Sequence, residues 1–107
     1  MTPNYQAFRK DCIDKLEALV GKRYESKSKL EKKLEDLFGC KVKLEASTYC
    51  RDDNNKELLE QYKDEIILDW SYVGLIKDKY IYCDIDIYYA KTRANELLIT
   101  EVNYEFE

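Results

Sequence analysis

The sequence predicts a single α+β domain over residues 1–107, in which two N-terminal helices pack on one face of a four-stranded antiparallel sheet and the other sheet face lies in water. Three observations predict this fold. Apolar residues recur at helical spacing up to residue 38, they alternate with polar residues from residue 42 onwards, and most later connections are short. Three Gly and one Pro leave little material for linkers or a second domain.

The first helix is expected over about residues 3–20. Thr2 followed by Pro3 is a helix-start signal, because Thr caps free backbone N–H groups and Pro is tolerated at the first helical position. Apolar side chains then recur every three or four residues until Gly21, which offers a C-terminal stop.

The second helix is expected over about residues 28–38. Ser28 and Glu31 match an S-x-x-E capping box, and an apolar stripe follows up to Gly39. Its basic residues are interspersed with acidic ones, as on an ordinary solvated helix face. Direct nucleic-acid binding, if there is any, would use the three lysines of this helix, Lys29, Lys32 and Lys33.

Strands are expected over residues 42–50, 64–73, 79–90 and 97–106. The second should end at Gly74. Between the first two, RDDNN reads as a polar loop, and Asn55 could cap a short helix in the segment KELLEQY. In the last strand, two alternating sets should face opposite sides: Leu98, Thr100, Val102, Tyr104 and Phe106 against Ile99, Glu101, Asn103 and Glu105.

Charge is divided unevenly along the chain. Residues 1–43 contain 11 Lys/Arg and 7 Asp/Glu, a formal charge of +4, whereas residues 44–107 contain 7 Lys/Arg and 15 Asp/Glu, a formal charge of −8. An acidic surface repels phosphate backbones and attracts cationic partners. The sheet is therefore a poor platform for nucleic acid and a suitable one for a basic protein, although acidic residues also serve solubility alone.

Familiar catalytic and metal-binding patterns are missing from the sequence. There is no His, no Gly-rich phosphate loop and no G-x-S-x-G motif, so neither an enzyme nor a cofactor is expected. No two of the four cysteines, Cys12, Cys40, Cys50 and Cys83, are spaced as C-x-x-C. Reduced, buried thiols are expected, with two disulfides as the alternative for a secreted protein.

The expected location is the cytoplasm. The start of the chain, MTPNYQAFRKDC, lacks the apolar core of a signal peptide. No stretch of the sequence approaches the roughly 20 apolar residues that span a bilayer, so no membrane association is expected.

Carboxylates and tyrosines should share the water-facing side of the sheet. The candidate partner-binding residues are Asp69, Tyr80, Tyr82, Asp84, Asp86, Tyr88, Glu101 and Glu105. Like charges on adjacent strands cost about 0.2–1 kcal/mol per opposed pair, so a sequence shaped only for stability should mix in Lys. Tyrosine rings between carboxylates suit a partner rich in Arg and Lys, which can pair with the acids and stack on the rings.

Three interpretations of this face compete. Tyr belongs in strands by propensity and acids keep an exposed sheet soluble, which needs no partner. Alternatively, the face docks on a basic protein surface, one that normally holds nucleic acid. In the third interpretation, a divalent metal ion binds the four carboxylates of a metal-dependent nuclease, Asp69, Asp84, Asp86 and Glu101.

In size, charge and lack of catalytic groups, the chain resembles two classes of small acidic inhibitor. The segments that prompt this resemblance are YIYCDIDIYY, from Tyr80 to Tyr89, and the acidic end EVNYEFE. One class is the phage anti-CRISPR proteins directed at Cas9, and the other is the bacterial immunity proteins that neutralise nuclease toxins. The first resemblance implies blocked loading of guide RNA or target DNA onto a Cas9-type nuclease in the host cytoplasm. The second implies the same docking on a toxin.

Overall fold

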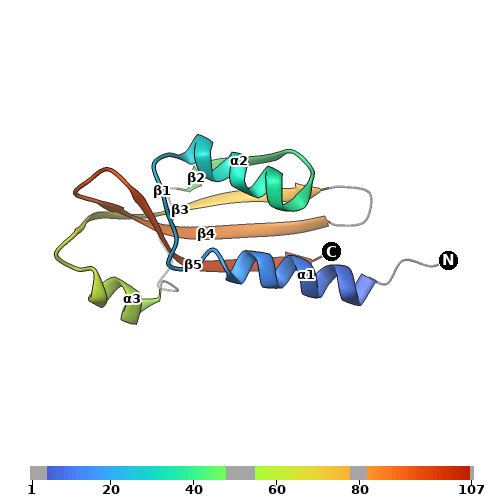
Figure 1. Cartoon of the computed structure of the whole chain (residues 1–107), viewed down its shortest axis with the longest axis horizontal. Coiled ribbons are helices and arrows are strands. Elements are labelled where there is room, and N and C mark those ends of the chain that lie inside the picture. Colours follow the sequence, from blue (N-terminus) through green and yellow to red (C-terminus); the bar gives the residue numbers. More distant parts are fainter. Residues whose placement is uncertain (1–4, 48–54, 78–81, 107) are drawn as a thin grey trace.

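The computed structural model describes residues 5–47, 55–77 and 82–106, in which three helices and five strands are found (Figure 1). The elements are α1 (Tyr5–Glu17), β1 (Arg23–Tyr24), α2 (Lys27–Phe38), β2 (Val42–Ser47), α3 (Lys56–Gln61), β3 (Ile66–Lys77), β4 (Tyr82–Thr92) and β5 (Leu97–Phe106). The strands form one curled antiparallel sheet in the order β1-β5-β4-β3-β2. The predicted α+β class is confirmed, whereas the predicted four-stranded sheet with two helices is wrong.

The additional strand, β1, is two residues long and lies between the first two helices. It pairs with the start of β5, and further backbone bonds extend the pairing. The amide of Gly21 donates to the carbonyl of Ile99 at 2.8 Å, and the amide of Ile99 donates to the carbonyl of Lys22 at 3.0 Å. These bonds cover part of an edge that would otherwise present unpaired backbone groups. Two residues are too few to show the alternation of a strand, so the sequence pattern did not reveal β1.

The core lies between the sheet and the first two helices. We call the sheet face toward these helices the inner face and the opposite one the outer face. Figure 1 shows α1 along β5 and α2 beside β2 and β3. The buried cluster includes Cys12, Leu16 and Leu19 from α1 and the turn after it, Leu30, Leu34 and Phe38 from α2, and Leu44, Ile76, Ile85, Ile87 and Ile99 from the sheet. Burial of these apolar side chains holds the two layers together.

The N-terminus of α2 differs from the predicted capping box. The N-cap is Ser26, whose side chain accepts a hydrogen bond from the backbone amide of Lys29 at 3.3 Å. Ser28 lies within the first turn. The Glu31 carboxylate reaches β2 instead, where it accepts a bond from the Leu44 amide at 2.8 Å. The S-x-x-E match therefore placed the N-cap two residues too late, and the predicted helix starts one residue after the observed one.

Replacement of Ser26 by alanine should lower the free energy of unfolding by about 1 kcal/mol, because an N–H group of the first turn loses its acceptor. The matched control is Ser28→Ala, which removes an exposed hydroxyl and should change the free energy by less than about 0.5 kcal/mol. Urea denaturation measures both. A larger loss for the Ser28 variant than for the Ser26 variant would contradict the observed cap.

Strand β3 continues past Gly74, where the sequence predicted its end. A Cβ atom at Gly74 would lie 2.7 Å from a side-chain carbon of Leu44 and 3.0 Å from the Lys43 carbonyl oxygen of β2. The glycine therefore allows a close approach of β2 rather than a turn. Because the strand continues, it also brings Leu75 onto the outer face, next to Val73 and beyond the predicted end of the strand.

A bulge divides β5 into two parts. The pairing with β4 slips by one residue between Ile99 and Glu101, so Thr100 is the extra residue. From Val102 onwards the predicted sides of the strand are confirmed. Before the bulge the predicted sides are wrong, since Ile99 belongs to the inner core cluster and Leu98 lies outside that cluster.

The outer face is not in water along its whole length, contrary to the prediction. Six buried residues lie on it toward the turn that joins β4 to β5: Ser71, Tyr88, Ala90, Thr92, Leu98 and Thr100. None belongs to the core cluster of the inner face, so they form a second, smaller buried group. The rest of the outer face, toward the start of β4, remains accessible.

The short helix α3 lies at this same end of the sheet (Figure 1). Asn55 is its N-cap, as the sequence suggested, and accepts a bond from the Leu58 amide at 3.1 Å. Arg23 of β1 links the turn after α3 to the sheet, because its guanidinium donates to the Glu65 carboxylate at 2.9 Å and lies 4.9 Å from the centre of the Tyr62 ring. The guanidinium also pairs with the Glu96 carboxylate at 3.4 Å. The pKa of Arg23 is raised, because its interactions with Glu65 and Glu96 outweigh the effect of desolvation.

Candidate functional site

Five carboxylates gather on the open part of the outer face. They are Glu45 of β2, Asp84 and Asp86 of β4, and Glu101 and Glu105 of β5, and we call this set the acidic face. Asp84 lies directly opposite Glu105, so two like charges share one cross-strand position. Asp86 follows two residues along β4, on the same side of the strand. The sheet register thus brings together most of the predicted acids and adds Glu45.

Two lysines share the outer face with these acids, since Lys43 pairs with Leu75 and Lys77 pairs with Tyr82. Within the described ranges, the carboxylates of Glu45, Asp84, Glu101 and Glu105 make no ion pair. Glu45, Asp84 and Glu105 are exposed, and Asp86 and Glu101 are half-buried. An opposed pair of like charges destabilises a sheet by a few tenths of a kcal/mol. The face therefore lowers stability slightly and presents negative charge to solvent.

Apolar surface lies within the acidic face. Val73 of β3 is 39% exposed and pairs with both Glu45 and Asp86, and Leu75 is half-buried opposite Asp84. Neither residue was among the predicted site residues: Val73 lies within the predicted strand but is neither acidic nor aromatic, and Leu75 lies beyond the predicted end of the strand. Had the alternation been continued through Gly74, Leu75 would have been placed on this face beside Val73. An apolar centre between charged groups is typical of protein-binding surfaces.

The three predicted tyrosines differ in what they offer a partner. Tyr82 is 38% exposed, and the ammonium group of Lys77 lies 5.7 Å from its ring centre, so a cation already occupies part of its surroundings. Tyr88 is only 1% exposed and has no area to offer. Tyr80 lies outside the described residues. The aromatic contribution to this face therefore comes from Tyr82.

Asp69 stands apart from the other predicted acids. It pairs with Ala90, at the covered end of the outer face, and Ala90 is six residues from Asp84 along β4. At the rise of a strand this separation is about 20 Å. In residues 5–47, 55–77 and 82–106, no group of three or more His, Cys, Asp or Glu side chains is arranged to hold a metal ion. The register thus offers no support for the four-carboxylate metal site.

The basic residues of α2 occupy the other side of the molecule from the acidic face. Lys29 is paired with Glu25 at 2.6 Å, while Lys32 and Lys33 are exposed. Of the three predicted lysines, Lys32 and Lys33 therefore form no ion pair within the described residues, and they lie among mixed charges, as expected for a solvated face.

Two of the cysteines are neighbours in the core. Cys12 of α1 and Cys83 of β4 are both buried, and the Cys83 thiol donates to the backbone carbonyl of Asp84 at 3.5 Å. The neighbouring Cys83 thiol and burial raise the pKa of Cys12 above its usual range, so the thiol stays protonated. Cys12 and Cys83 are buried thiols outside any disulfide, Cys40 is half-buried, and Cys50 lies outside the described residues.

Comparison of the chain with protein-family models, with curated proteins and with solved structures finds no match. None of the helices in the described part of the chain is both long and apolar enough to cross a membrane. The class that the fold and the face define is thus an α+β protein whose sheet presents an acidic surface with an apolar centre.

Proposed function

We propose that the protein is an inhibitor that acts in the cytoplasm and docks its acidic face on the basic, nucleic-acid-binding surface of a Cas9-type nuclease. The observation that carries this proposal is the group of exposed carboxylates with no ion-pair partner among the described residues. Asp84 and Glu105 lie directly opposite each other beside Leu75, and Glu45 lies opposite Val73. Repulsion between these like charges lowers the stability of the free chain, and ion pairs with a cationic partner would offset that loss.

The mechanism is competition for cationic side chains. A channel that holds a nucleic acid carries Lys and Arg placed to contact phosphates. Asp84 and Glu105 would pair with such residues, while Val73 and Tyr82 would contribute area that loses water on docking. Guide RNA or target DNA is then excluded, because the same cationic groups cannot serve both ligands.

The order of addition in a cleavage assay tests this function. The purified protein is mixed with each of a panel of Cas9-type nucleases, either before guide RNA or after guide and target DNA have bound. We expect loss of cleavage in the first order and much less in the second, with weaker inhibition well above about 0.1 M salt, where screening shortens charge interactions. Full cleavage in both orders with every nuclease would contradict the proposed target.

A parallel measurement uses nuclease toxins in place of Cas9-type nucleases. The acidic face suits any basic nuclease surface, so the immunity-protein alternative predicts protection against a toxin and no effect on Cas9-type cleavage. That result would mean that the acidic face docks on a nuclease toxin and not on a Cas9-type nuclease. Incubation of the protein alone with RNA or DNA and Mg²⁺ tests the nuclease alternative, which predicts cleavage that a chelator stops.

A further inference from the structure

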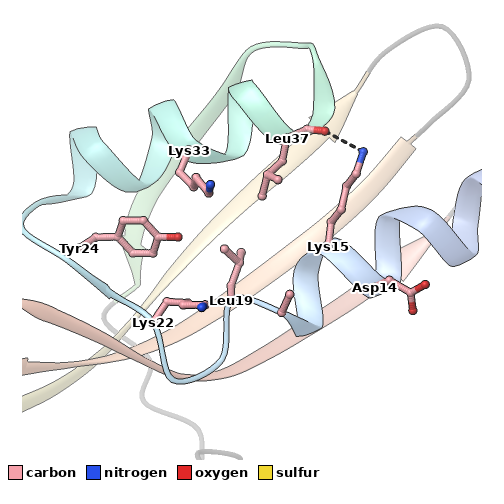
Figure 2. Close-up of a pocket in the computed structure, with 8 residues that line it drawn as sticks. Asp14, Lys15, Leu19, Lys22, Tyr24, Lys33 and Leu37 are labelled. Atoms are coloured by element: carbon pink, nitrogen blue, oxygen red, sulfur yellow. Dashed lines mark hydrogen bonds between the residues drawn. The ribbon is translucent and has the colours of Figure 1, made fainter.

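A pocket of about 330 Å³ opens between α1 and α2, on the side of the sheet away from the acidic face (Figure 2). Its lining residues come from α1 and the turn after it, from β1 and from α2: Asp14, Lys15, Ala18, Leu19, Lys22, Tyr24, Lys33 and Leu37. Ligand sites in proteins begin at about 300 Å³, so the pocket fits a small molecule.

Lys15 connects α1 to α2 at the pocket, so its ammonium group is already engaged in contacts within the chain. The Lys15 ammonium group donates to the backbone carbonyl of Leu37 at 3.0 Å, across from α1 to the end of α2 (Figure 2). It also pairs with Asp11 at 2.9 Å. Lys15 therefore supports the wall of the pocket, and its charge is largely satisfied within the chain.

The other two lysines of the pocket have no such partner. Within the described part of the chain, the ammonium groups of Lys22 and Lys33 form no ion pair or hydrogen bond. Figure 2 shows the side chains of Lys33 and Tyr24 extending from the upper wall and the side wall toward the space between the helices, with Lys22 along its lower border. The carboxylate of Asp14 points away from that space. The polar groups directed at the pocket are thus cationic or neutral.

Apolar and aromatic groups complete the lining. Leu19 is 2% exposed and belongs to the core, and Leu37 packs against the same core. Tyr24 is half-buried, and burial raises the pKa of its hydroxyl, which therefore remains a hydrogen-bond donor at neutral pH. The pocket combines an apolar wall with two ammonium groups and a hydroxyl donor.

We propose that this pocket binds a small organic anion, whose carboxylate or phosphate group lies between Lys22 and Lys33 and accepts a bond from Tyr24. The apolar body of the ligand packs against Leu19 and Leu37. A neutral ligand would leave both ammonium groups unpaired, and a cation would be repelled by them. This binding activity is additional to the proposed docking and uses the other side of the molecule.

Titration of the ¹⁵N-labelled protein with small aryl ligands tests the site by NMR. Phenyl phosphate and benzoate are the anionic probes, and benzyl alcohol and benzylamine are the neutral and cationic ones. We expect saturable shifts of the amides of Leu19, Lys22, Tyr24, Lys33 and Leu37 with an anion, at dissociation constants of about 1 mM or below. Tighter binding of the phosphate or of the carboxylate identifies the head group.

Variants connect the binding to the two lysines. The double variant Lys22→Gln with Lys33→Gln should weaken anion binding at least about tenfold, because two charge-assisted contacts are lost. Lys32→Gln is the matched control on the same helix, outside the pocket, and should bind as the original chain does. The spectra themselves show whether each variant is folded. The proposal is overturned if neither anion gives saturable shifts, if benzyl alcohol binds as tightly, or if the folded double variant binds unchanged.

Discussion

Replacing Asp84 and Glu105 together by lysine should abolish inhibition of the target nuclease and slow association at least about tenfold at low ionic strength. The two residues are exposed and directly opposite each other at the open end of the outer face. Each replacement changes the formal charge by two, so the pair brings the chain from −4 to zero and places two cations against a cationic partner. Surface plasmon resonance and the cleavage assay measure the two effects.

The stability of these variants separates function from folding. The double variant exchanges one like-charged pair for another, so its melting temperature should stay within a few degrees of the original value. The single variant Asp84→Lys creates an opposite-charge pair with Glu105 and should raise the free energy of unfolding by about 0.2–1 kcal/mol while it weakens binding. Such a gain in stability with a loss in binding is typical of a functional surface.

A control with the same change in charge places the lysines elsewhere. Asp36 on α2 and Asp64 in the turn after α3 are exposed and lie outside the acidic face. The double variant Asp36→Lys with Asp64→Lys should therefore retain most of the inhibition. If both double variants inhibit equally, net charge and not the acidic face determines binding.

Truncation of Leu34 to alanine should lower the free energy of unfolding by about 2–5 kcal/mol, through lost burial and the cavity left behind. Leu34 is fully buried and lies between Leu30 and Phe38 on the side of α2 that faces the sheet. A domain of this size has a total stability of about 5–15 kcal/mol, so the loss is a large fraction of it. Chemical denaturation with urea gives the value.

The control for this substitution is Lys32→Ala, on the exposed side of the same helix. Alanine is a strong helix former, so this change should alter the stability by less than about 0.5 kcal/mol. A cost below about 1 kcal/mol for Leu34→Ala would mean that α2 is not held by its apolar stripe, contrary to the observed burial.

Elements with a long, regular apolar pattern were predictable from the sequence. The stripe of α2 and its end at Gly39, which adopts a left-handed conformation with φ of 68°, follow from local rules that need no tertiary context. The bounds of β5 were also predicted within a residue. The bulge within β5 was not, because an extra residue changes the facing of a strand without altering its β-propensity.

The sequence could not predict which residues of the candidate site are exposed to a partner, because exposure depends on tertiary packing. Tyr82 and Tyr88 occupy equivalent positions in the alternation of β4, yet one is 38% exposed and the other 1%. Alternation gives the side of a strand but not what covers that side. The same limit applies to Asp69, whose distance from Asp84 follows from strand register, and to Gly74, whose role depends on the neighbouring strand.

Because side chains alternate along a strand, each strand of this sheet places every second residue on the inner face and the others on the outer face. Asp84 and Asp86 on the outer face can be replaced by other residues, while Cys83, Ile85 and Ile87 on the inner face keep the hydrophobic core intact. Mutational screens of this chain should therefore yield separation-of-function alleles with period two in the first half of β4, from Tyr82 to Ile87, and not beyond it, where Tyr88 and Ala90 are also buried.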